Sequence, residues 1–484
     1  MDVKKLLVVG SGTAGLISAI ILKTRFNIQI DVISSNSIGI VGVGEGSTEH
    51  FKEFMQFVGI DQYELIKKTD ATYKSGIMFE GWNKSPYLHS VASPFNHKLG
   101  QYRAVYAHQI SVNSDYILPE YSWNSRVPSY FLDRPDLFPV HQFHFNTYKL
   151  NEFLINFAKK IGIKFYDDEV VDINFTEYGF IKSVIGKKDS YNYDFYIDST
   201  GFKRILINKM GAKWISYKKY LKMNSAITFQ TEDEEEYNKW TLSKTMDAGW
   251  LFKIPTWGRH GNGYIFSDEY ITEDDAKKEV ENYLQKPVNI GKKFSFDPGC
   301  LEKAWIKNCC AIGLSSSFVE PLEASSIGTS IQQSFLLMHK IANYNEYSVI
   351  EYNKSFTDIM ENIRDFIALH YVTKKTNSLF WRDIQNVELP DSLNFKLESW
   401  KNKLPIDEDF SDSSKYILFT AHNFIVVLNG LKLFNVDSIS AEYNLHADYI
   451  KEFCKDTIEQ HLHFEKTEPM ISHKKMINYI RNNY

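Results

Sequence analysis

The chain has 484 residues, of which 43% are hydrophobic and 24% are charged, a composition typical of a soluble globular protein. The formal net charge is −5 and no long basic run occurs, which argues against a nucleic-acid partner. No uninterrupted apolar run could span a bilayer, and the 4 cysteines fit neither a metal site nor a disulfide framework. We therefore expect a cytoplasmic protein without a metal ion and without a membrane partner.

The first residues predict a nucleotide-binding turn. The apolar run Leu7–Val9 is followed by Gly10, Gly12 and Gly15 in the spacing Gly-x-Gly-x-x-Gly, and then by an apolar helical pattern. In such a turn the first glycine permits the bend, the second lets the backbone approach a pyrophosphate, and the third brings the helix close to the strand. A purely structural turn is the alternative. The strand–turn–helix context favours a dinucleotide site that includes Gly10, Gly12, Thr13, Ala14 and Gly15.

A second apolar run, Ile28–Ile33, follows at the spacing of a β–α–β unit. Dinucleotide folds usually carry Asp or Glu after this strand for the ribose hydroxyls, whereas this chain has Ser34, which can hydrogen-bond but carries no charge. Asp31 lies inside the strand pattern and is a poor substitute. Residues 41–48 form another glycine-rich segment, which we interpret as a backbone approaching a flat cofactor rather than as a plain loop.

Residues 72–82 predict a strand that carries Lys74 on the same side as Gly76, Met78 and Glu80. A lone lysine in a strand usually lies on a solvated edge. In a pocket rich in aromatic residues it would behave differently, because desolvation lowers the pKa of the amine and makes it reactive. The strand pattern by itself favours the solvated edge.

The rest of the chain predicts a divided nucleotide domain. An amphipathic helix is expected over residues 147–161, and strands at 195–202 and 309–314 are expected to return to the nucleotide sheet. Residues 249–255 and 263–267 have the pattern of antiparallel strands in an inserted region. Residues 318–328 then open a helix that runs on through Ser334 to Lys340. Small residues and a carboxylate at the N-terminus of this helix make an anion-binding turn. From about residue 348 the chain is mainly helical.

Taken in order, these motifs resemble the flavin-dependent halogenases, the two-component enzymes typified by tryptophan halogenases. The resemblance runs from the N-terminus to about residue 430. Its most specific part is the stretch 73–82, in which Lys74 falls on the family's catalytic lysine. Gly10–Gly15 is similar to the family's FAD fingerprint, and further matches follow in the family's order at residues 42–48, 198–202, 318–323 and 364–371. The shared order favours a catalytic Lys74 over an edge lysine.

The resemblance implies an α/β fold with a Rossmann-like FAD-binding domain of the glutathione-reductase and hydroxybenzoate-hydroxylase type, an inserted mixed sheet and a mainly helical C-terminal region. We expect FAD-binding parts at 1–82, 146–215 and 301–347 (the last with a halide-side turn), a substrate-side insertion at 83–145, an antiparallel substrate region at 216–300 and a helical substrate cap at 348–484. Besides the first turn, the implied flavin-binding residues are Ser34, Gly44, Glu45, Gly46, Asp198, Gly313 and Leu314.

The implied enzyme uses FAD as FADH2, delivered by diffusion from a separate flavin reductase, together with O2 and a halide ion. Hypohalous acid formed beside the flavin would pass through an internal channel to a small aromatic substrate. Lys74 would meet it there, either as an ammonium that hydrogen-bonds the acid or as a neutral amine that forms a haloamine. Glu323 falls on the family's second catalytic residue, and it would orient the oxidant, stabilise the cationic ring and help remove its proton.

Two departures from the family concern the flavin side. Phe252 replaces the second tryptophan of a Trp-x-Trp-x-Ile-Pro element that is thought to keep substrate from the flavin, and a phenylalanine ring should still fill that space. After Glu323 the family usually has Ser-Thr-Gly, whereas this chain has Ala324, Ser325 and Ser326. The halide is expected beside Ser325 and Ser326. Compared with the family, this turn loses a hydroxyl at Ala324 and gains a side chain at Ser326. We therefore predict a preference for bromide or iodide over chloride, because the larger halides are easier to desolvate and to oxidise.

The substrate residues match less closely. His97 and Leu99 fall near the family's indole-stacking positions, and Leu99 stands where an aromatic residue is expected. Residues 421–430 show no obvious tryptophan clamp, so we expect phenols, indoles or larger aromatic compounds as substrates rather than free tryptophan. We also expect a homo-oligomer in solution.

A single-component flavin monooxygenase and a non-catalytic FAD-binding protein are the alternatives to a halogenase. The single dinucleotide fingerprint disfavours the first, and the presence of both Lys74 and Glu323 disfavours the second.

Overall fold

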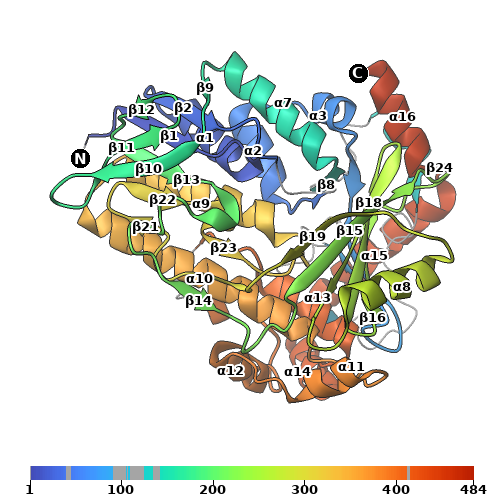
Figure 1. Ribbon diagram of the computed structural model, residues 1–484. Coiled ribbons are helices and arrows are strands. Elements are labelled where there is room, and N and C mark those ends of the chain that lie inside the picture. Colours follow the sequence, from blue (N-terminus) through green and yellow to red (C-terminus); the bar gives the residue numbers. More distant parts are fainter. Residues whose placement is uncertain are drawn as a thin grey trace.

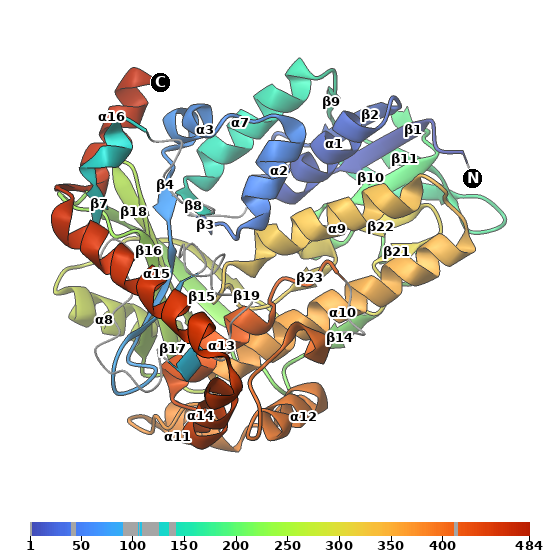
Figure 2. The ribbon, with the colours of Figure 1, turned by 180° about the vertical axis from the view of Figure 1, so that it is seen from behind.

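The computed structural model describes residues 2–39, 45–90, 105, 107–108, 125–134, 142–410 and 415–484. Two sheets with helices packed around them organise the molecule (Figure 1). The two ends of the chain lie at opposite sides of the molecule in both views (Figure 1, Figure 2). Gly44, His97 and Leu99 lie outside the described residues, so the expectations for them stay predictions. Within the described part of the chain, no helix is both long enough and apolar enough to span a bilayer.

A six-stranded sheet carries the glycine-rich turn. Its order is β21-β22-β13-β1-β2-β9, and all neighbours are parallel except the pair β21 and β22. The central strand β1 is buried at every position but its first, as expected for a parallel strand covered on both faces. The strands are β1 (Lys5–Val9), β2 (Gln29–Ser34), β9 (Lys164–Asp167), β13 (Phe195–Asp198), β21 (Trp305–Ile306) and β22 (Cys309–Ala311).

Helix α1 (Thr13–Arg25) starts directly at the glycine turn and is buried from Gly15 to Leu22, because it packs against α2, α7 and α9 as well as the sheet. The expected helix after residue 147 is confirmed as α7. The long helices α9 and α10 lie side by side across the middle of the molecule (Figure 2). The helices of this half are α2 (His50–Val58), α3 (Gln62–Thr69), α7 (Thr147–Lys160), α9 (Ser325–Ile341) and α10 (Glu346–His370).

A seven-stranded sheet forms the other half, in the order β19-β15-β18-β17-β16-β5-β6. Its neighbours are antiparallel except β16 and β5, which run parallel. The two antiparallel strands expected near residues 249 and 263 are confirmed as its paired strands β17 and β18. The strands are β5 (Gly76–Glu80), β6 (Tyr87–Ser90), β15 (Ser225–Glu232), β16 (Trp240–Met246), β17 (Gly249–Thr256), β18 (Arg259–Phe266) and β19 (Ile290–Ser295), and α8 (Glu273–Leu284) packs on β18.

Small sheets connect the halves or extend them. They comprise β3 (Glu45–Gly46), β8 (Gln142–Phe145) and β4 (Thr72–Lys74); β10 (Val170–Phe175), β11 (Ile181–Gly186) and β12 (Ser190–Tyr191); β14 (Trp214–Ser216), β20 (Gly299–Leu301) and β23 (Ser317–Phe318); and β7 (Arg126–Pro128) with β24 (Met470–Ser472). The C-terminal part is mainly helical, with α11 (Leu379–Asp383), α12 (Asp391–Ser399), α13 (Ala421–Leu431), α14 (Val436–Leu445), α15 (Asp448–Thr467) and α16 (His473–Asn483). Short 3-10 turns are η2 (Ser129–Leu132), η4 (Gly201–Lys203), η5 (Gly313–Ser315), η6 (Ile384–Asn386) and η7 (Asp407–Phe410).

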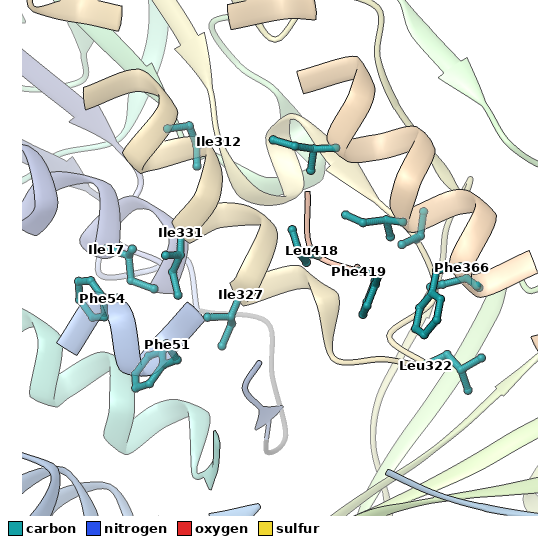
Figure 3. Packing of buried hydrophobic residues seen from close by; sticks show 14 of the residues in the cluster. Ile17, Phe51, Phe54, Ile312, Leu322, Ile327, Ile331, Phe366, Leu418 and Phe419 are labelled. Atoms are coloured by element: carbon teal, nitrogen blue, oxygen red, sulfur yellow. The ribbon is translucent and has the colours of Figure 1, made fainter. Parts of the chain in front are cut away.

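The apolar core runs continuously from one half to the other around the start of α9. Figure 3 shows Ile327 and Ile331 of α9 on the side of α1 and α2, with Leu418, Phe419 and the α10 ring of Phe366 on the opposite side. The rings of Phe366 and Phe419 stack at 4.0 Å between centroids. Burial of these side chains on both sides holds the first turn of α9 between the two halves.

The strand expected over residues 72–82 is two strands in different sheets. β4 pairs with β8, whereas β5 pairs with β16 and β6. The break falls at Ser75, whose backbone N–H and hydroxyl both donate to the carbonyl of Lys239. The expected boundary at residue 82 therefore does not coincide with a change of sheet, because β5 already belongs to the seven-stranded sheet. Strands of the expected parts 1–82, 146–215 and 301–347 do share the six-stranded sheet.

The glycine-rich turn generates a prediction about stability. Gly10 has φ +109°, and a Cβ there would lie 2.2 Å from the Ser199 carbonyl oxygen. We expect Gly10→Ala to lower the free energy of unfolding by about 2 kcal/mol or more, because the new residue is both strained and crowded. Gly12 has φ −67° and no atom within 4 Å of a Cβ, so Gly12→Ala is the matched control. Urea unfolding measures both, and equal loss in the two variants would contradict this account.

Candidate active site

A cleft that is open to solvent lies over the glycine-rich turn at the carboxyl ends of β1 and β2. Gly10, Gly12, Thr13, Ala14 and Gly15 all line it. The space above Gly12 is open, and α1 has no side-chain cap at its N-terminus, so its first N–H groups face the cleft. An anionic pyrophosphate fits this arrangement, so the residues present fit a dinucleotide such as FAD.

The expected cofactor residues divide between the wall of the cleft and positions behind it. Ser34, Glu45, Gly313 and Leu314 line the cleft, as do Asp168 and Glu169, which the sequence pattern did not point to. Asp198 lies behind the wall instead. Its buried carboxylate accepts hydrogen bonds from Thr200, Leu206, Ile207 and Ser315, and it thereby holds the turn that follows β13. Asn151 of α7, also missed, donates to the Ser11 carbonyl at 2.8 Å and supports the glycine-rich turn.

Lys74 lies in a separate, narrow chamber. Its side chain is 2% exposed, and its Nζ donates to the Ser47 carbonyl oxygen at 2.7 Å. Burial lowers the pKa of Lys74 to about 8, while the charges of Glu323 and Glu49 oppose this shift. The solvated edge favoured by the strand pattern alone is therefore wrong. The lysine sits near the point where it can change protonation state at neutral pH.

Glu323 lines the same chamber as Lys74 and is 3% exposed. Its Oε2 lies 2.8 Å from His89 Nδ1, and its Oε1 lies 2.9 Å from His370 Nε2, although the second contact is out of line for a regular hydrogen bond. Burial by itself would raise the pKa of Glu323, but the facing His89 and His370 outweigh burial and lower the pKa below its ordinary value. The two residues that the family resemblance singled out thus meet in one chamber.

A middle cavity adjoins both the cleft and the chamber. It shares Glu45, Leu314, Ser326 and Ile327 with the cleft, and Ile77 with the chamber. Gly46 lines it, together with the rings of Trp250 and Phe252 and residues Pro321 and Leu322. A Cβ on Gly263 would lie 2.5 Å from the Phe252 ring, so this ring packs tightly on its neighbouring strand. Phe252 therefore fills the position at which the family has tryptophan.

The start of α9 borders both the cleft and the middle cavity. Ala324 precedes the helix in the left-handed region, with φ 54° and ψ 31°, and the helix begins at Ser325 without a side-chain cap. Ser326 is exposed and lines both spaces, whereas Ser325 is 2% exposed and lines neither. The uncapped N–H groups of a helix as long as α9 attract an anion to this end.

A dinucleotide cleft, an adjoining cavity and a chamber with a buried lysine and a buried carboxylate together define the class of flavin-dependent halogenases. Comparison with known proteins agrees. A family model described as tryptophan halogenase matches residues 5–441. The 7-chloro-L-tryptophan 6-halogenase KtzR of Kutzneria sp. (strain 744) is 29% identical over 456 residues, which cover 83% of this chain and 86% of that protein.

Tryptophan 7-halogenase RebH of Lentzea aerocolonigenes is 27% identical over 450 residues, 85% of this chain and 84% of that protein. The crystal structure of a tryptophan halogenase from Shewanella frigidimarina superposes with a TM-score of 0.89 at 25% identity, and it covers 99% of this chain and 98% of that one. The chain belongs to the tryptophan halogenase family. It is an oxidoreductase that uses FADH2 from a separate reductase, O2 and a halide ion to halogenate an aromatic substrate.

The burial of Lys74 leads to a prediction about stability and pH. The pKa of Lys74 is about 8 in the folded protein against an ordinary value of 10.5, so below pH 8 the folded protein bears the cost of a buried ammonium. Lys74→Met should raise the free energy of unfolding at pH 7 by about 1–3 kcal/mol. Between pH 8 and 10.5 the lysine is neutral in the folded protein but still protonated in the unfolded chain, so the free energy of unfolding of the parent rises with pH. The difference in free energy of unfolding between Lys74→Met and the parent should therefore shrink over this range.

Denaturant unfolding of parent and variant at pH 7, 8.5 and 10 measures this difference. Lys455→Met, at a lysine whose side chain is 66% exposed, controls for the loss of a positive charge. A Lys74→Met variant that is less stable than the parent at pH 7, with a difference that does not change with pH, would contradict the prediction.

Proposed function

We propose that this protein halogenates an indole-like or phenol-like aromatic compound in the chamber of Lys74 and Glu323, with hypohalous acid directed there from the flavin cleft. When bound, reduced FAD supplies with O2 and halide the oxidising halogen species. The observation that carries the proposal is the meeting of a buried lysine and a buried carboxylate in one chamber, whose lining residue Ile77 also lines the middle cavity. Residues Gly10–Gly15, Ser34, Glu45, Gly313 and Leu314 would hold the cofactor, with Gly46 at the middle cavity.

Lys74 is the residue proposed to meet the oxidant. Its Nζ is buried and held by one backbone carbonyl, which leaves further N–H groups for the acid. As an ammonium it would donate to hypohalous acid, and as a neutral amine it could take the halogen as a haloamine. Because the pKa of Lys74 is about 8, both forms are accessible near neutral pH, and both roles remain open.

Glu323 is the proposed proton acceptor. Attack of the aromatic ring on the halogen forms a carbon–halogen bond while the halogen–oxygen bond of hypohalous acid, or the nitrogen–halogen bond of the haloamine, breaks. The electron pair of the broken bond leaves with the oxygen, which takes up a proton and becomes water, or stays on the Lys74 amine, and the ring is left cationic. The ring then regains its aromatic electron pair when the C–H bond breaks and the proton passes to a carboxylate oxygen. An ionised Glu323 stabilises the cationic ring and accepts this proton. Its lowered pKa supports the ionised form at working pH.

The proposed halide preference rests on the start of α9. Ala324 and Ser326 both line the middle cavity, beside the N–H groups of the first helical turn. Ala324 lacks a hydroxyl that could solvate a small anion, and the Ser326 side chain narrows the space. We infer that bromide or iodide, which give up water more easily than chloride, is preferred at this turn.

The substrate class is inferred from a buried acceptor in the chamber. Gln142 pairs with Lys74 in the β4–β8 ladder and is 2% exposed. Its Nε2 donates to Glu49, while its Oε1 accepts no hydrogen bond from any residue that the structure describes. A buried acceptor without a partner favours a substrate that brings an N–H or O–H group. Indoles and phenols both bring such a group.

A homo-oligomeric state and a cytoplasmic location stay predictions from the sequence.

The test of the proposed function is a product analysis. A panel of indoles and phenols is incubated with enzyme, FAD, a flavin reductase, NADH and one halide at a time, with Lys74→Ala and Glu323→Gln beside the parent. Mass spectrometry should find halogenated product from the parent, at least 100-fold less from Lys74→Ala, and more brominated than chlorinated product in competition. Both variants should still bind FAD, because neither residue lines the cleft.

The outcomes separate the alternatives. Hydroxylated product that Lys74→Ala leaves unchanged would make the protein a monooxygenase and overturn the proposal. Mainly chlorinated product would retain the halogenase but overturn the halide preference. FAD binding with no product from any compound would favour a binding protein.

Gln142 gives a prediction about selectivity. Gln142→Leu should lower kcat/KM for indole about tenfold, the size expected for one buried hydrogen bond, and lower it much less for N-methylindole, which has no N–H to donate. Steady-state kinetics of the parent and of Gln142→Leu, each with both compounds, compare the loss of kcat/KM on indole with the loss on N-methylindole. An equal loss on the two compounds would show that the amide shapes the chamber without binding the donor.

A further inference from the structure

The carboxylate of Glu323 lies between two imidazole rings, and the hydrogen bonds behind each ring decide where its protons are. His89 belongs to β6, and His370 is the last residue of α10. Both side chains are at most 2% exposed, so both contacts are buried. The other titratable groups that face Glu323 are Lys74 from β4 and Tyr87 from β6.

His89 is assigned as a neutral ring by the residue behind it. The Oδ1 atom of Asn423 accepts hydrogen bonds from the backbone N–H and the hydroxyl of Thr420, at 2.8 and 3.1 Å. The amide nitrogen of Asn423 therefore faces His89 Nε2, at 3.2 Å. An amide nitrogen only donates, so Nε2 accepts and the single ring proton is on Nδ1, which donates to Glu323.

His370 is placed differently. Its Nδ1 lies 2.9 Å from the carbonyl oxygen of Phe366, and since a carbonyl only accepts, Nδ1 carries a proton. Its Nε2 lies 2.9 Å from Glu323 Oε1. In a neutral ring this nitrogen would hold its lone pair 2.9 Å from a carboxylate oxygen, and so close an approach of two electron-rich atoms is repulsive. A second ring proton turns the contact into a buried ion pair.

We propose that His370 is the positioning residue of Glu323: it carries a proton on both ring nitrogens in the resting enzyme and holds Glu323 as a carboxylate inside the chamber. The inference rests on the proposed role of Glu323 as proton acceptor and adds the group that keeps it ready. The rings of Phe79, Trp82 and Phe366 surround His370, so the charged pair is closed off from water on that side. His89, which is neutral, orients the carboxylate.

Two histidines and a glutamate also suggest a metal site. Here the ring nitrogens contact the carboxylate oxygens directly at 2.8 and 2.9 Å, so the space that a cation would occupy between them is closed. Among the residues that the structure describes, no cluster has the arrangement of metal ligands. A proton, rather than a metal ion, joins the groups.

Nuclear magnetic resonance of the enzyme labelled with ¹⁵N-histidine tests the proton positions without turnover. We expect one slowly exchanging imidazole with protons on both nitrogens at pH 7, lost in His370→Gln and retained in His89→Asn. A neutral ring protonated on Nδ1 should be lost in His89→Asn. A His370 ring with a single protonated nitrogen, or a doubly protonated His89, would overturn the proposal. If His370→Gln does not fold, the parent and His89→Asn spectra still decide it.

The pH dependence of kcat tests the consequence. The amide nitrogen of glutamine can take the place of His370 Nε2, and that of asparagine the place of His89 Nδ1, but neither carries a charge. His370→Gln should move the acid limb of kcat to higher pH by about one unit or more, because the variant lacks the imidazolium that helps to offset the burial of Glu323, while Lys74 remains in place. His89→Asn should lower the rate without moving that limb.

The two failures are distinguishable. If the parent halogenates nothing, the proposed function fails while the resonance experiment still reports the protons. If the parent halogenates and both variants shift the acid limb equally, the charge is not specific to His370, and this inference alone is overturned.

Discussion

Two buried carboxylates hold the turn on which the rest of the site depends. Glu320 accepts hydrogen bonds from Trp250 at 2.8 Å and from Tyr371 at 2.6 Å, and three residues later Glu323 is held by His89 and His370. Removing a carboxylate from water is costly unless hydrogen bonds or charges compensate, and burial raises the pKa of Glu320 to about 7. The residues between them cannot shift without breaking one of these buried contacts.

This fixed turn is also where the three spaces of the molecule meet. Pro321, Leu322 and Ala324 line the middle cavity, Glu323 lines the chamber, and Ser326 lines both the cavity and the cleft. One short segment at the junction of the two sheets therefore borders the cofactor side and the lysine side together. This segment thus separates the cofactor side from the lysine side, as the proposed division of the reaction between two sites requires.

The chamber combines opposite charges on two buried side chains, Lys74 and Glu323. Burial lowers the pKa of Lys74 to about 8, and the negative charge of Glu323 limits that shift. Glu323 in turn stays ionised because of the imidazoles that face it. The ionisation of each group thus depends on partners from other strands and helices. The surroundings of Lys74 in the chamber set the pKa of its amine, and with it the reactivity of the lysine.

Local patterns in the sequence determined the glycine-rich turn, the helix α7 and the strands β17 and β18, because periodicity and glycine spacing are properties of neighbouring residues. The resemblance to a family added Lys74 and Glu323. The tertiary structure alone decided that residues 72–82 divide between two sheets and that Asp198 lies behind the cleft. It also brought His89 to Glu323 across 234 residues of chain. Buried hydrogen-bond partners come from distant segments that meet only when the core packs, so no local pattern in the sequence predicts them.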